Sequence, residues 1–126
     1  IMQLLVLTEE KTYELEKHTL PIQNLFLDNR ISKLEKMEKI QQWYRYHQLV
    51  ANQNQEDFIT TLSLIFKLAP YTSSFNKENV VWGFHWEQQE FVVYYSSAGI
   101  MIQVSKKFRK DKIDEFLSKL LELLIG

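Results

Sequence analysis

The stretch VVWGFHWEQQEFVVYYSSAGIMIQV, residues 80–104, decides the fold. Within Val80–Trp86 every second residue is large and apolar, and the same alternation returns in Phe91–Tyr95 and Ile100–Val104. Short polar stretches separate the three runs. A period of two predicts strands with one buried face, and short turns between adjacent strands predict an antiparallel meander.

Helical patterns lie on both sides of these strands. Apolar residues recur every three or four positions over 22–51, which predicts one long amphipathic helix. A second helix is predicted over 54–69, with Asn54 as its N-cap and Pro70 as its stop. A third apolar stripe predicts a C-terminal helix over 111–125.

Three further segments complete the chain. Residues 2–7 are apolar over too short a run to separate a strand from the start of a helix. Residues 8–19 are charged and compatible with a helix, and residues 71–79 are expected to form a polar loop. We therefore expect a single α+β domain over 1–126. Its antiparallel meander has three or four strands with two to three helices on one face, and a ferredoxin-like arrangement is one variant.

Composition limits the function classes. The chain has 126 residues, a net charge of −1 and no cysteine, so no overall field draws it to nucleic acid or to an anionic membrane. Without cysteine it has no disulfide and no thiolate site, which fits the cytoplasm and the periplasm equally well. No run approaches the roughly 20 apolar residues of a membrane helix. Because the first residue is Ile1, we expect membrane contact only through a segment missing from this chain.

The sequence contains no recognisable catalytic or metal-binding pattern. Its histidines, His18, His47 and His85, have no second ligand at an HxH or HxxxH spacing. Three glycines leave no room for a phosphate-binding loop, and Ser96–Gly99 lacks the GxSxG pattern of a nucleophile elbow. We expect no enzyme activity, no metal and no cofactor.

Aromatic side chains are the candidates for partner binding. One helix cannot bury every ring of the cluster formed by Trp43, Tyr44 and Tyr46. Strand alternation directs His85 and Tyr94 away from the face that carries the large apolar residues. Tyrosine, tryptophan and arginine are enriched at binding hot spots, so these five residues are predicted to contact a protein partner.

A basic stretch is the second candidate surface. Lys106, Lys107, Arg109 and Lys110 surround Phe108, a ring that could stack on a base while the cations meet phosphates. The alternative is a solvated connection into the last helix. The net charge of −1 and the lack of a second basic patch favour that alternative, so nucleic acid is not an expected partner.

The pattern from about Leu25 to Leu124 resembles the periplasmic part of the inner-membrane assembly-platform proteins of type IV pili and type II secretion, the PilN and GspL kind. The stretches that carry the resemblance are FITTLSLIFKLAP (58–70), VVWGFHW (80–86), FVVYY (91–95) and the last helix. The resemblance implies a membrane anchor, a long amphipathic helix and a small ferredoxin-like domain that dimerises and pairs with a sister protein.

These observations predict a non-catalytic interaction or assembly domain. Its long helix and a sheet edge would dock a protein partner or a second copy. The most concrete form is a soluble fragment of a membrane-anchored pilus or secretion platform protein. The alternative is a small immunity, inhibitor or mobile-element protein that binds and blocks a single target.

Overall fold

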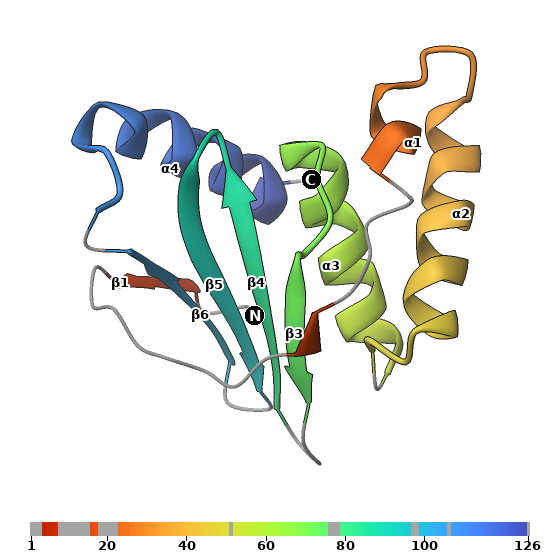
Figure 1. Ribbon diagram of the computed structural model, residues 1–126, viewed down its shortest axis with the longest axis horizontal. Coiled ribbons are helices and arrows are strands. Elements are labelled where there is room, and N and C mark those ends of the chain that lie inside the picture. The colour runs from red at the N-terminus through yellow and green to blue at the C-terminus, as the bar shows by residue number, and fades with distance from the viewer. Residues whose placement is uncertain are drawn as a thin grey trace.

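The structure is a computed structural model that describes residues 4–7, 16–17, 23–50, 52–75, 79–96, 99–105 and 107–125. These residues form one six-stranded sheet and four helices, and the helices lie on one side of the sheet (Figure 1). The fold is therefore of the α+β class, as the sequence predicts. Three helices precede four consecutive strands, an order that differs from the βαββαβ order of a ferredoxin-like domain.

The predicted meander forms the centre of the sheet. The strands are β1 (Leu4–Leu7), β2 (Glu16–Lys17), β3 (Thr72–Phe75), β4 (Val80–Trp86), β5 (Gln89–Ser96) and β6 (Gly99–Val104). They lie in the order β1-β6-β5-β4-β3-β2. β1 is parallel to β6, and every other neighbouring pair is antiparallel. The meander β4–β5–β6 is confirmed, and three further strands widen it on both sides.

The turn between β4 and β5 is tighter than predicted. Glu87 and Gln88 adopt left-handed backbone angles, with φ of 47° and 68°, which is the conformation of a two-residue hairpin turn. Gln89 and Glu90 lie in the polar stretch 87–90, which separates the first two predicted strands and was expected to form the turn, but they pair with β4. The hairpin therefore keeps its ladder up to the turn and fixes the register of the central strands.

The strands outside the meander include two that the sequence analysis did not identify. The apolar run at 2–7 contains β1, so its ambiguity is resolved in favour of a strand. β3 lies inside the predicted loop 71–79, and β2 lies within the charged segment 8–19, so both predictions are wrong at these residues. The physical reason is that β3 and β2 add to the sheet through backbone hydrogen bonds, which need no apolar alternation.

The predicted helix over 22–51 is two helices. The helices are α1 (Gln23–Leu27), α2 (Lys33–Tyr46), α3 (Gln53–Phe66) and α4 (Lys110–Ile125). Between α1 and α2 the backbone N–H of Arg30 donates to Asp28 Oδ1 at 2.9 Å, which holds a turn. The hydroxyl of Ser32 then accepts the backbone N–H of Glu35 at 3.2 Å and caps α2. These local side-chain bonds compete with the helix and break it.

The helix that was predicted over 54–69 is α3, which begins and ends earlier than predicted. Asn52, not Asn54, is the N-cap, and its side chain accepts the backbone N–H of Gln55 at 2.9 Å. Lys67 adopts the left-handed conformation, with φ of 54°, and ends the helix three residues before Pro70. A left-handed residue followed by proline is a common helix stop.

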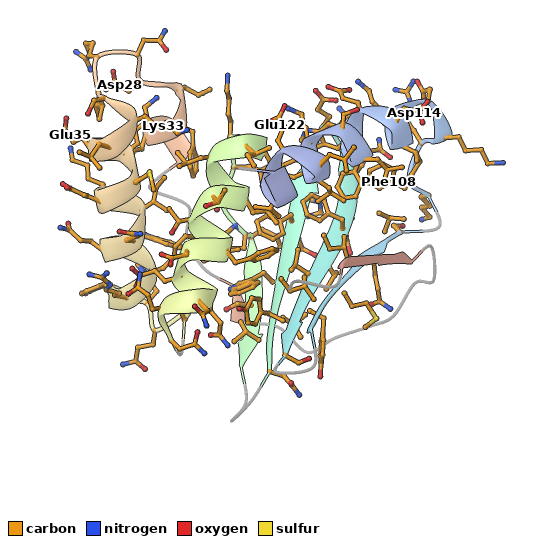
Figure 2. All side chains as sticks on the ribbon, turned by 180° about the vertical axis from the view of Figure 1, so that it is seen from behind. Asp28, Lys33, Glu35, Phe108, Asp114 and Glu122 are labelled. Carbon is orange, nitrogen blue, oxygen red and sulfur yellow. The ribbon has the colours of Figure 1, made fainter. Side chains whose placement is uncertain are left out.

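The helices form one layer, with α3 between α2 and α4 (Figures 1 and 2). Residues of α3 and α4 pack on the sheet through the rings of β4 and β5, whereas α2 packs on the outer side of α3. The largest fully buried side chains come from all three of these helices and from the meander: Trp82, Tyr44, Phe84, Phe91, Phe116, Ile40, Ile59, Leu62, Ile102, Leu120, Val80 and Val93. The opposite face of the sheet carries no described helix.

Candidate protein-interaction surfaces

Two of the predicted contact residues, Trp43 and Tyr44, are buried in the core. Both lie on the side of α2 that packs against α3, and the Tyr44 hydroxyl pairs with the Ser63 hydroxyl of that helix. Burial raises the pKa of Tyr44 well above its ordinary value, although the hydrogen bond to Ser63 opposes the shift. The buried rings of Trp43 and Tyr44 hold the helices together, so these two residues are not available to contact a partner.

Tyr46 is the exposed member of the cluster, with 83% of its surface accessible. It is the last residue of α2, and its ring meets the His47 ring edge-on at a centroid distance of 5.0 Å. The His47 ring lies 4.3 Å from the ring of Trp43, and its Nδ1 lies 3.0 Å from the Trp43 carbonyl oxygen. A buried tryptophan thus orients the histidine, and the histidine supports the tyrosine.

Arg45, next to Tyr46, is held in a similar way. Its Nε donates to Glu56 Oε2 at 2.7 Å and its Nη2 donates to Glu56 Oε1 at 2.5 Å. The carboxylate of Glu56 is buried at the start of α3, whereas the guanidinium is more than half exposed. The hydrogen bonds and charge of Glu56 raise the pKa of Arg45. We call Arg45, Tyr46 and His47 the α2 corner.

His85 and Tyr94 lie elsewhere, on the face of the sheet that no described helix covers. The ring of His85 is exposed and stacks on Tyr71 with the centroids 4.0 Å apart. Tyr94 is half-buried and pairs with Val81, several rows along the sheet from His85. The structure therefore divides the predicted contact residues between two surfaces, and it does not bring His85 and Tyr94 together.

A shallow hollow of about 400 Å³ lies beside His85 and Tyr71. Partial burial, together with the charge and hydrogen bond of Glu90, raises the pKa of Tyr71. The remaining lining is Phe66, Lys67, Leu68, Ala69, Trp86 and Glu87. This lining mixes a cation, an anion and apolar groups, so it specifies no ligand class. Tyr71 was not among the predicted contact residues because it lies in the segment 71–79, which was expected to form a loop.

The basic stretch has no ring available for a base. Phe108 is buried between the rings of Trp86 and Phe116, at centroid distances of 6.2 and 5.0 Å. Lys107 and Lys110 are exposed, whereas Lys106 lies outside the described residues. Without an accessible aromatic ring, the stacking interaction that the sequence allowed cannot form in this structure.

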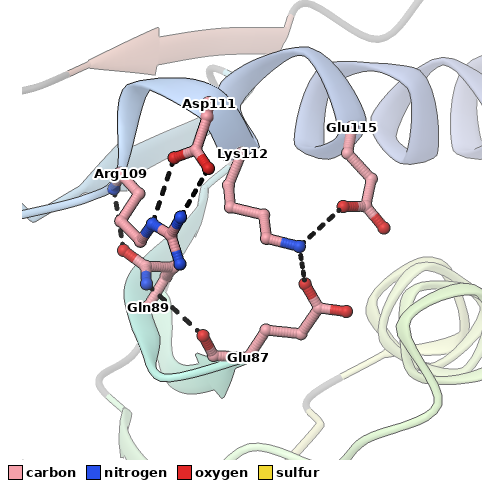
Figure 3. A network of polar contacts seen from close by, with 6 residues as sticks. All are labelled: Glu87, Gln89, Arg109, Asp111, Lys112 and Glu115. Carbon is pink, nitrogen blue, oxygen red and sulfur yellow. Dashed lines mark hydrogen bonds and ion pairs between the residues drawn. The ribbon is translucent and has the colours of Figure 1, made fainter.

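Charged side chains around this stretch connect the β4–β5 turn to the start of α4 (Figure 3). The Arg109 backbone N–H donates to Gln89 Oε1 at 2.8 Å, and the Arg109 side chain pairs with Asp111 at 2.5 Å. The Nζ of Lys112 lies 2.8 Å from a Glu87 carboxylate oxygen. Hydrogen bonds with Glu87 and then Glu115 raise the pKa of Lys112. Arg109 and Lys112 are therefore already paired with acidic side chains of the same chain.

Neither a metal cluster nor a membrane span is found in the described part of the chain. Among the described residues, no three histidine, cysteine, aspartate or glutamate side chains gather closely enough to hold a metal ion. No helix of the described ranges is long and apolar enough to cross a membrane. No protein-family model matches the chain, and neither a curated protein nor a solved structure matches it significantly.

Proposed function

We propose that this domain is a non-catalytic interaction module that docks a partner protein through the α2 corner. The observation that carries the proposal is an exposed tyrosine that packs on a half-buried histidine, beside an exposed arginine that pairs with a buried carboxylate. Tyrosine and arginine are the residue types that dominate binding hot spots. Side chains that are already oriented lose less conformational entropy on binding, which favours their use as anchors.

The geometry of the α2 corner indicates what its partner must offer. The Tyr46 ring needs an apolar recess, and its hydroxyl needs a hydrogen-bond partner at the far end. Arg45 already uses Nε and Nη2 on Glu56, so its exposed edge suits an acceptor such as a carbonyl oxygen or a carboxylate. A recess with acceptors at its rim is therefore the complementary surface.

Two biological settings fit such a module. The resemblance in pattern supports a component of a pilus or secretion assembly platform, in which a sister protein would meet the α2 corner. A small immunity or inhibitor protein is the alternative, and its target would meet the same corner. A hydrophobic span upstream in the full gene would favour the platform, whereas a neighbouring toxin gene would favour the inhibitor.

Site-specific photocrosslinking in the source cells tests the proposal. We expect a benzophenone amino acid at position 46 to give one discrete adduct with another protein. The matched control is the same amino acid at Leu34, which is 68% exposed and lies near the other end of α2. Equal adducts at both positions would contradict docking at the α2 corner. An adduct at position 46 that contains only a second copy of this chain would contradict a separate partner.

Replacing Tyr46 by alanine should separate binding from stability. We expect the free energy of unfolding to stay within about 0.5 kcal/mol of wild type, because an exposed side chain contributes little to the fold. Binding of the crosslinked partner should fall at least about tenfold, which corresponds to the loss of one hot-spot residue. Tyr44→Ala is the matched control, and its unfolding transition should shift clearly because that ring is buried. A destabilised Tyr46→Ala variant would show that Tyr46 has a structural role.

A further inference from the structure

Gln48, the residue that follows the α2 corner, has an uncommon backbone conformation. Its φ is 54°, in the left-handed region that glycine adopts freely and that other residues adopt only at a cost. Gln48 comes directly after His47, the C-cap of α2, at the position where helices most often carry glycine or asparagine. A glutamine at this position therefore makes the fold less stable than a glycine would.

Hydrogen bonds at the end of α2 hold Gln48 in this conformation. Its backbone N–H donates to the Arg45 carbonyl oxygen at 3.0 Å, and the N–H of Leu49 donates to the Tyr44 carbonyl oxygen at 2.9 Å. These two bonds form a Schellman motif, and Leu49 is buried beside it. The surrounding structure therefore imposes the left-handed conformation on whichever residue occupies position 48.

The side chain of Gln48 does not offset this cost within the fold. Gln48 is exposed, and among the described residues its amide has no hydrogen-bond partner. An exposed side chain of this kind contributes little to stability. A residue in a costly conformation, whose side chain does not stabilise the fold, is a candidate for a functional contact.

The other non-glycine residues with positive φ have a different structural context. Glu87 and Gln88 form the two-residue turn between β4 and β5, which needs positive φ at both positions. Lys67 ends α3 and lines the shallow hollow. Gln48 differs from all three because its backbone is bonded to Arg45, a residue of the α2 corner whose side chain is more than half exposed.

We propose that Gln48 contacts the partner protein together with the α2 corner, and that its amide binds a peptide group of the partner's backbone. The inference rests on the proposed function and adds a contact residue to the same surface. A side-chain amide carries both N–H donors and a carbonyl acceptor, so it is complemented by a neutral group that offers one of each. A backbone peptide group at the rim of the recess for Tyr46 meets this requirement. Keeping glutamine instead of glycine at position 48 then lowers stability and raises affinity.

Replacing Gln48 by glycine should raise stability and weaken binding at the same time. The melting temperature should rise by about 3–6 °C, because glycine adopts the left-handed conformation without cost. In the source cells, the adduct formed by the benzophenone amino acid at position 46 should fall at least about fivefold, because two hydrogen bonds to the partner are lost. Lys67→Gly, which places a glycine at the end of α3, should leave the amount of this adduct unchanged.

Gln48→Met tests the amide separately from the length of the side chain. Methionine has a similar shape but no amide, so the adduct should fall as it does with glycine, while the melting temperature stays within about 2 °C of wild type. A chain with Gln48 that gives no adduct at position 46 would refute docking at the α2 corner, and this inference with it. An adduct that persists in both Gln48 variants, or a lower melting temperature for Gln48→Gly, would overturn the role of Gln48 alone.

Discussion

Replacing Phe116 by alanine is expected to lower the free energy of unfolding by about 3–5 kcal/mol. Phe116 is fully buried on α4, and its ring lies 4.9 Å from Phe91 and 5.0 Å from Phe108. It also lies 5.5 Å from Phe66 and 5.7 Å from Trp86. One ring therefore joins α4, α3 and the central strands. Its removal opens a cavity that these neighbours, all large and rigid, fill only in part.

Urea unfolding followed by far-ultraviolet circular dichroism measures this change. Phe116→Leu keeps much of the apolar volume and should lose clearly less stability than Phe116→Ala. The slope of the transition should stay the same for both variants if folding remains two-state. A loss below about 1 kcal/mol for Phe116→Ala would contradict a core centred on this ring.

The central strands could be predicted because their information is local. In Val80–Trp86 the alternation alone separates core residues such as Trp82 from outward residues such as His85, and the structure agrees. β3 carries no such pattern, and its pairing with β4 is decided by long-range backbone hydrogen bonds. A sequence reveals a strand through its side chains, so a polar strand such as β3 remains hidden.

The interruption between α1 and α2, at residues 28–32, was not predicted although its signal is present in the sequence. Ser32 and Glu35 have the spacing of a capping box, and the Ser32 hydroxyl does cap α2. The continuous apolar period across Leu27 and Ile31 concealed it, because a stripe at helical spacing does not reveal an interruption of one turn. In the structure Leu27 and Leu34 are exposed, so this stripe is not a continuous buried face.

The candidate surfaces were predictable in part. A single helix face cannot bury Trp43, Tyr44 and Tyr46 together, and the structure exposes Tyr46 alone. Which rings are buried depends on where α3 lies, and no local pattern specifies that position. The charged neighbours of Phe108 left base stacking open as one reading, whereas its ring is buried and Arg109 and Lys112 pair with acidic groups of the same chain. Tertiary ion pairs of this kind cannot be read from composition.

Leu62→Ala and Leu120→Ala should each lower the free energy of unfolding by about 2–5 kcal/mol, because both side chains are almost completely buried. Leu121→Ala, one residue along α4, removes the same atoms from a half-exposed position and should change it by less than about 0.5 kcal/mol. The comparison of Leu120→Ala with Leu121→Ala keeps the residue type and the helix the same, so the difference in the free energy of unfolding reports the burial of the side chain.

Chemical unfolding with urea measures the free energy of unfolding of all three variants. Near-neutral effects of both Leu62→Ala and Leu120→Ala would show that the assigned helix faces are wrong.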